Sequence, residues 1–127
     1  MQQIRVESGN PFGYIAAEAA YNGGEEWLES VLAQLKENYE YVVNTFAEEL
    51  PEVVVAPLEG TYLCWIDLSA YVKAEDMKEF IQKKCHLAID FGDWFGGDKY
   101  AQFIRMNLAT SLENVKIGVE AIVKNLK

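Results

Sequence analysis

The hydrophobic positions of this 127-residue chain change their spacing several times, and each change indicates a new element. Asn10 followed by Pro11 is a typical helix start, because asparagine caps the first turn and proline suits the first helical position. The alanine-rich run 15–21 continues this helix and gives it a flat surface. An Asn-Gly-Gly run at 22–24 is expected to end it, since these residues tolerate positive φ.

A long amphipathic helix is predicted next, from about Glu25 to the residue before Pro51. Its apolar positions recur at spacings of three, four and seven. They are Leu28, Val31, Leu32, Leu35, Tyr39, Val42, Val43, Phe46 and Leu50. About 25 residues at about 1.5 Å each give nearly 40 Å, against about 30–35 Å for a compact domain of this size. The sequence therefore predicts that this helix extends beyond the domain's own core.

Strand-like segments follow the long helix. Residues 53–55 are predicted as a short buried strand and 87–89 as another. Residues 61–68 and 102–109 alternate apolar and polar positions, as half-buried strands do. Between them, residues 74–85 form a predicted helix whose inner face carries Met77, Phe80, Ile81 and Cys85, and residues 91–97 form a loop rich in glycine and aromatic residues.

The final helix is expected to start at a capping box made by Thr110 and Glu113. Its predicted buried face consists of Leu112, Val115, Val119, Ile122, Val123 and Leu126. The element order predicts an α/β (α+β) sandwich in which helices pack on a small mixed sheet, preceded by a long linking helix. The predicted division is residues 1–24 with a short helix, the linking helix at 25–50, and a small domain at 51–127.

Composition narrows the classes of partner. Half of the residues are hydrophobic, which is enough for a real core, and the net charge is -9. Such a charge argues against nucleic acid and against an anionic membrane surface as partners. No stretch of sequence has the length and apolarity of a membrane span, and the N-terminus does not resemble a signal peptide, so we expect a cytoplasmic protein. The two cysteines, Cys64 and Cys85, are expected to be buried free thiols.

Arg105 is the main candidate for chemistry. It lies in the middle of the predicted strand 102–109, on the face opposite Ile104 and Met106. A guanidinium presents five donors in a fixed plane, which match a carboxylate or a phosphate in bidentate fashion. Either a partner carboxylate lies nearby in the fold, or Arg105 binds an anionic ligand; the residues alone leave both open.

Other residues give weaker signals. His86 is the only histidine and the cysteines lack CxxC spacing, so neither a zinc site nor a Cys–His pair is expected. Glu59 and Asp67 bracket the strand 61–68 and are the best-placed carboxylates. The aromatic residues of the loop 91–97 either cover a pocket or complete the core. The chain thus offers an anion anchor and a candidate aromatic lid, but no complete catalytic set.

Four segments resemble a known family. They are Asn-Pro-Phe-Gly-Tyr-Ile-Ala-Ala-Glu-Ala-Ala-Tyr-Asn-Gly-Gly-Glu-Glu-Trp-Leu at 10–28, Pro-Leu-Glu-Gly-Thr-Tyr-Leu-Cys-Trp-Ile-Asp at 57–67, and Phe-Gly-Asp-Trp-Phe-Gly at 91–96 followed by Phe-Ile-Arg-Met-Asn-Leu-Ala at 103–109. In this order they resemble the last part of class I/II aminotransferases of the cystathionine β-lyase-like (MalY/PatB) branch. The match runs from about residue 10 to the end.

The resemblance implies the small C-terminal domain of a fold type I enzyme that depends on pyridoxal phosphate. Such enzymes are usually homodimers that transaminate amino acids or cleave C–S bonds by β-elimination. The family's arginine in the Arg-x-Asn strand binds the substrate α-carboxylate, and Arg105 takes its place here. The resemblance and placement together make four further residues candidates for lining the pocket: Tyr62, Trp94, Phe95 and Asn107.

The family's cofactor-binding lysine does not carry over. It follows a serine by three residues, and the four serines here are followed at that distance by Pro11, Ala33, Val72 and Asn114. The resemblance implies that the cofactor contacts lie in a large upstream domain of the same chain. We therefore expect a fragment that binds pyridoxal phosphate weakly or not at all and is inactive alone. The alternative is a stand-alone, non-catalytic α/β module that binds an anion or a protein.

Overall fold

The computed structural model describes residues 9–127 and divides the chain into two compact units, with the boundary between residues 33 and 34. The predicted segment 1–24 therefore begins with eight residues that lie outside the described ones. Across residues 9–127, none of the helices combines the length and the apolar character needed to span a membrane.

The first unit contains helix α1 (Pro11–Gly23) and the start of helix α2 (Glu25–Glu49). As predicted, the Asn10 side chain caps α1 by accepting from the N–H of Phe12, at 2.9 Å. Gly24 follows the helix, and its N–H donates to the carbonyl of Ala20. None of the residues of α1 is buried.

The second unit begins at residue 34 and contains the rest of α2. The bounds of α2 agree with those of the predicted helix to within one residue. Val42, Phe46 and the following Leu50 are buried, whereas Leu28 and Leu32 remain about half exposed. Asn38 is fully buried beside them, which the apolar pattern did not indicate. Its side-chain amide donates to the carbonyls of residues 108 and 110, at 2.8 and 2.9 Å, and so ties α2 to the segment that follows the last strand.

Four strands form one sheet within the described residues, in the order β1-β2-β4-β3. They are β1 (Val54–Val55), β2 (Leu63–Asp67), β3 (Asp90–Phe91) and β4 (Phe103–Asn107). All three pairings are antiparallel. The prediction of a mixed sheet is therefore wrong. β1 is not buried throughout either, since 62% of Val54 is exposed.

The prediction of a strand at residues 87–89 is wrong, because β3 begins only at Asp90. The strand forms at Asp90–Phe91, because these two residues are the ones that pair with Arg105 and Ile104 of β4. The predicted loop 91–97 is also partly helical: a short helix α4 (Asp93–Gly96) is followed by the 3-10 turn η3 (Gly97–Tyr100).

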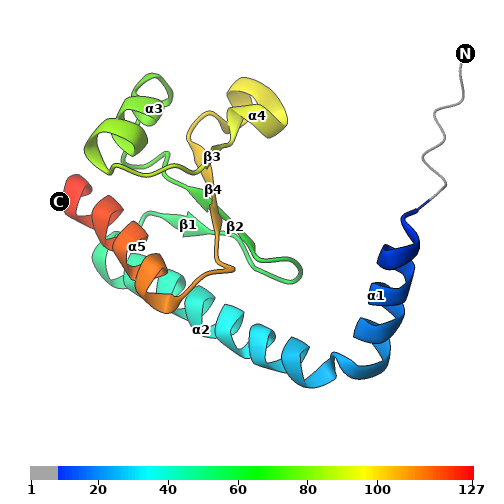
Figure 1. Cartoon of the computed structure of the whole chain (residues 1–127). Coiled ribbons are helices and arrows are strands. Elements are labelled where there is room, and N and C mark those ends of the chain that lie inside the picture. Colours follow the sequence, from blue (N-terminus) through cyan, green and yellow to red (C-terminus); the bar gives the residue numbers. More distant parts are fainter. Residues whose placement is uncertain (1–8) are drawn as a thin grey trace, which may run out of the picture. The chain divides into compact units, whose positions relative to one another are not determined.

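One face of the sheet carries the hydrophobic core. Cys64, Ile66, Ile104 and Met106 alternate onto this face, as the period-two pattern predicted. Helices α2 and α5 (Leu112–Leu126) and the helical segment 74–84 pack against it. Figure 1 shows α5 beside the second half of α2, where the Tyr41 hydroxyl contacts Glu120 at 3.2 Å.

Two predictions about these helices need correction. The segment 74–84 is a 3-10 turn η1 (Ala74–Asp76), a short α3 (Met77–Glu79) and a π-helical turn η2 (Phe80–Lys84) in succession, although its predicted inner face is buried. Helix α5 is capped by Ser111, not by Thr110, because the Ser111 hydroxyl accepts from the N–H of Asn114. The observed fold is a small α/β sandwich in which α2, α5 and the helical segment 74–84 cover one face of the sheet.

Candidate functional site

The candidate site lies on the sheet face opposite the core. Strand alternation places Arg105 there, and the register puts Trp65 of β2 and Asp90 of β3 directly opposite it on either side. Side chains directly opposite in neighbouring strands share a face and lie close together. The three residues therefore form a row across the sheet that the backbone pairing itself positions.

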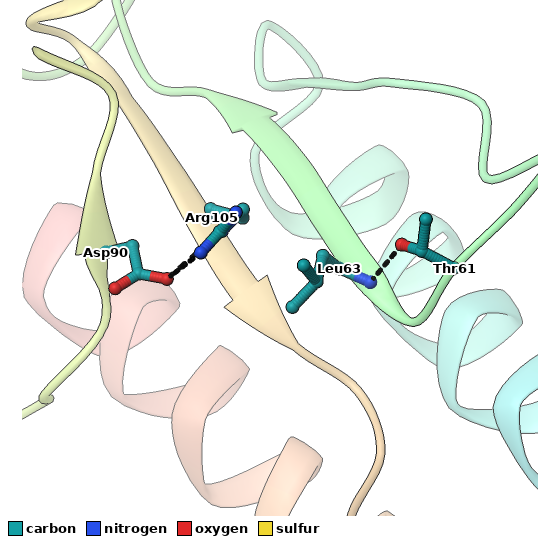
Figure 2. A network of polar contacts seen from close by, with 4 residues as sticks. All are labelled: Thr61, Leu63, Asp90 and Arg105. Carbon is teal, nitrogen blue, oxygen red and sulfur yellow. Dashed lines mark hydrogen bonds and ion pairs between the residues drawn. The ribbon is translucent and has the colours of Figure 1, made fainter. Parts of the chain in front are cut away.

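Arg105 forms an ion pair with Asp90. Figure 2 shows the two side chains pointing toward each other from adjacent strands. One oxygen of Asp90, Oδ2, accepts from Nε of Arg105 at 3.0 Å and from Nη2 at 2.6 Å. Both side chains remain partly exposed, at 29% for Arg105 and 38% for Asp90. A partner carboxylate is thus present, one of the two possibilities that the sequence left open.

A cluster of aromatic rings lies beside the guanidinium. Phe95 of α4 lies over Arg105, with 4.2 Å between Cζ and the ring centroid, which is a cation–π distance. Trp65 contacts Phe95 edge-on at 5.8 Å and stacks on Phe103 at 5.6 Å. Tyr100 meets both Trp65 and Phe103 edge-on. The result is a continuous aromatic surface beside one positive charge.

The structure brings Phe95, one of the four predicted pocket residues, into contact with Arg105. Trp94 packs edge-on against Phe91, at 5.5 Å, and 60% of it is exposed. Asn107 lies on the same strand two residues after Arg105, and its side chain accepts from the N–H of Ala109. Tyr62 precedes β2 and is 45% exposed. Their role as pocket-lining residues stays a prediction.

Thr61, two residues before β2, has an unusual backbone conformation. Its φ is +69°, which is strained for a β-branched residue. Its hydroxyl accepts from the N–H of Leu63 at 2.9 Å, as Figure 2 shows. The turn therefore fixes where β2 starts, and the register in which Trp65 faces Arg105 follows from that start.

Asp90 was missed as a functional candidate. Glu59 and Asp67 seemed better placed from the sequence, but Glu59 is exposed and Asp67 accepts from the N–H of Ser69 in a local turn. Asp90 becomes a candidate only once β3, the segment before the glycine-rich loop, is known to pair with β4. That pairing joins residues 15 positions apart, so periodicity within one segment does not show it.

The remaining titratable candidates lie elsewhere. Cys64 and Cys85 are buried and free, as predicted, and burial raises the pKa of Cys64 to about 12 and that of Cys85 to about 11. His86 is exposed and follows the helical segment with a φ of +56°. Within residues 9–127 there is no group of three or more histidine, cysteine or acidic side chains that could hold a metal ion.

Comparison with known proteins identifies relatives of one kind. The chain is 32% identical over 114 residues to the cystathionine beta-lyase of Corynebacterium glutamicum and 29% identical over 114 residues to cystathionine beta-lyase PatB of Bacillus subtilis. These alignments cover 90% and 89% of this chain but only 30% and 29% of the relatives. No family model matches the chain.

A solved structure agrees in fold. Cystalysin from Treponema denticola, crystallised with pyridoxal 5'-phosphate, superposes with a TM-score of 0.84 at 32% identity. The superposition covers 96% of this chain and 32% of cystalysin. The chain therefore spans about a third of the length of the proteins that it matches, and its sheet and helices are those of a part of such enzymes.

Proposed function

This chain is a relative of the PatB/MalY branch of pyridoxal-phosphate-dependent enzymes in sequence and in fold, and on that premise we propose that it forms the small domain of such an enzyme. The parent enzyme acts on amino acids as a C–S lyase or aminotransferase, with pyridoxal phosphate as its cofactor. The proposed parts are residues 1–24 as the end of a large domain, 25–50 as the linking helix and 51–127 as the small domain.

Arg105 binds the α-carboxylate of the amino-acid substrate in this proposal. The observation that carries it is the geometry of the partly exposed guanidinium, which is held on the sheet face opposite the core by the strand register and by two neighbouring side chains. A charged bidentate contact fixes both the position and the plane of a carboxylate. Holding the substrate this way would align its reacting carbon, whichever reaction follows.

The ion pair with Asp90 is compatible with this role. A guanidinium has five N–H donors, and Asp90 uses one on Nε and one on Nη2. Three donors remain on Nη1 and Nη2, which together form an edge able to bind a second carboxylate side by side with the first. Arg105 can thus be both an internal ion pair and an anion anchor.

The donor set suits the substrate better than the cofactor. When bound, pyridoxal phosphate supplies the electron sink for bond cleavage at the amino acid. A phosphate dianion beside Arg105 would lie close to the Asp90 carboxylate, and like charges in neighbouring strand positions repel. A single carboxylate adds less negative charge and matches the remaining edge. We therefore assign Arg105 to the substrate and none of the described residues to the cofactor.

Replacement of Arg105 in the full-length enzyme tests the proposal. Arg105→Gln should lower kcat/KM for amino acids by the equivalent of about 2–4 kcal/mol, typical for removing one partner of a charged contact. Arg105→Lys should retain part of the activity, since it keeps the charge but loses the planar fork. Lys36→Gln, which removes one charge from an exposed position on α2, is the matched control.

The carboxylate itself supplies a second readout. The wild-type enzyme should prefer an amino acid over the amine that lacks its carboxyl group, and Arg105→Gln should erase most of that preference. Unchanged kinetics in Arg105→Gln, or a loss that is equal for the amino acid and the amine, would contradict the role given to Arg105.

A further inference from the structure

We propose that Asp90 and Phe95 are positioning residues, which hold the Arg105 guanidinium so that its outer edge is ready to bind a carboxylate. This inference rests on the proposed function and adds to it two residues that act through Arg105. Both contact the guanidinium directly, Asp90 through hydrogen bonds along one edge and Phe95 through the face of its ring.

Asp90 fixes the guanidinium within its plane. Both of its hydrogen bonds end on the same oxygen, Oδ2, and they come from the Nε side of the group. Because Asp90 and Arg105 are directly paired in the β3–β4 ladder, the backbone sets the separation between the two side chains. This side-on contact uses one N–H of Nη2 and leaves the other N–H of Nη2 and both of Nη1 outside the ion pair.

Phe95 restricts the guanidinium through a second contact, made by the face of its ring. Its ring centroid lies 4.2 Å from Cζ of Arg105, so the ring limits rotation of the group out of its present orientation. Trp65 supports Phe95 from the side with an edge-on contact at 5.8 Å. Trp65 in turn is the β2 residue opposite Arg105, so the same register places the ring that supports Phe95.

Two effects of Asp90 on anion binding oppose each other. Its negative charge repels an incoming carboxylate, which would weaken binding. Its hydrogen bonds restrict a long side chain before the ligand arrives, so the ligand does not have to offset that loss of rotamer freedom. Positioning predicts that removing Asp90 weakens anion binding, whereas simple charge competition predicts that removing it strengthens binding. The sign of the change separates the two.

The first measurement reports the geometry. In 1H–15N spectra of the 127-residue chain, the Arg105 Nε–H should exchange slowly with water and should be shifted by the Phe95 ring. Asp90→Ala should speed the exchange about tenfold or more, since the acceptor is lost. Asp90→Asn should lie between, because its amide oxygen can still accept. Phe95→Leu should remove the ring shift while leaving the Nε–H bonded to Asp90.

The second measurement reports binding, with acetate as the carboxylate probe and the Arg105 Nε–H as the reporter. The acetate Kd should rise about fivefold in Asp90→Ala and about twofold to fivefold in Phe95→Leu, with Asp90→Asn recovering much of the loss. Two exposed residues serve as matched controls. Asp98→Ala removes an exposed carboxylate of the same segment, and Phe12→Leu makes the same change as Phe95→Leu at an exposed position of α1; both should leave Kd unchanged.

Tighter acetate binding in Asp90→Ala, or equal Kd values and equal exchange in all variants, would overturn the positioning role. Backbone amide spectra establish that each variant is folded, and Asp90→Asn, which is nearly isosteric, carries the test if Asp90→Ala is not. If acetate does not perturb Arg105 in the wild-type chain, the proposed function loses its support. The exchange and ring-shift measurements then still decide whether Asp90 and Phe95 hold the guanidinium.

Discussion

At the scale of single residues, two polar side chains each have more than one hydrogen-bond partner or donor to use. Arg105 combines an internal ion pair with three remaining N–H donors, so the ion pair is compatible with the ligand-binding role that we propose for the same residue. Asn38 also has two partners in the core, where its one amide group donates to the backbone carbonyls of residues 108 and 110. In both cases a polar group has a defined partner because neighbouring elements bring that partner within reach.

Because the Cys64 thiol is buried, we expect the free energy of unfolding to fall at alkaline pH. Burial raises the pKa of its thiol to about 12, from an ordinary value of 9.0. Above pH 9 the unfolded chain therefore ionises this thiol while the folded chain keeps it protonated. The free energy of unfolding should be unaffected by Cys64 below pH 9 and should fall between pH 9 and 12, by at most about 1.4 kcal/mol per pH unit.

Urea unfolding at pH 7.5 and pH 10 measures this effect. Cys64→Ala should show a smaller decrease than the wild-type chain, although its stability at pH 7.5 is also lower because a buried group is lost. Cys85→Ala is the comparison, since burial raises the pKa of Cys85 less, to about 11, with Lys84 opposing the shift. An identical decrease in the wild-type chain and Cys64→Ala would argue against a buried, protonated thiol.

At the scale of elements, the junction between β3 and α4 depends on a close backbone approach at Gly92. A Cβ at this position would overlap the carbonyl oxygen of Tyr100 and lie 2.8 Å from Cβ of Phe103. The N–H of Gly92 also donates to the carbonyl of Phe103 at 2.8 Å. Its φ of -63° is ordinary, so the lack of a side chain, and not backbone freedom, is what the fold requires here.

Gly92→Ala should therefore destabilise the chain by about 1–3 kcal/mol, the usual cost of overpacking. It should also move α4 and weaken the ring shift of Phe95 on Arg105. Gly60→Ala is the matched control, because nothing lies within 4 Å of a Cβ built there. Urea unfolding of the two variants gives the comparison, and equal midpoints would refute the close approach at Gly92.

The sequence predicted those elements whose pattern is internal to one segment. The alternation around Ile104 and the spacing along α2 both record contact with one core face, so the faces of β4 and of the second half of α2 could be read directly. The position of β3 and the Asp90 partner depend on pairing with a distant strand, which leaves no periodic trace in two residues. The cap of α5 was displaced by one residue, since neighbouring threonine and serine both suit that position.

At the scale of the whole molecule, the two units differ in how they are stabilised. Residues 34–127 contain the buried hydrophobic cluster, whereas α1 has no buried residue. An isolated helix of 13 residues is marginal in water, because its nucleation cost is offset by few hydrogen bonds. We expect the amides of α1 to exchange with solvent far faster than those of β2 and β4, which lie in the centre of the sheet.

Helix α2 allows this difference to be tested with two aromatic residues of a single element. Phe46 is 1% exposed within the core of residues 34–127, and Trp27 is 70% exposed near the start of the helix. Phe46→Ala should lower the free energy of unfolding by about 3–5 kcal/mol, as a buried cavity does, and Trp27→Ala by less than about 0.5 kcal/mol. Urea denaturation followed by far-UV circular dichroism measures both, and a comparable loss in the two variants would mean that Trp27 is buried in solution.

In the full-length enzyme we expect a different result for Trp27. If the proposed large domain covers residues 1–33 there, Trp27→Ala should lower the free energy of unfolding by more than it does in the 127-residue chain. The effect of Phe46→Ala should stay the same.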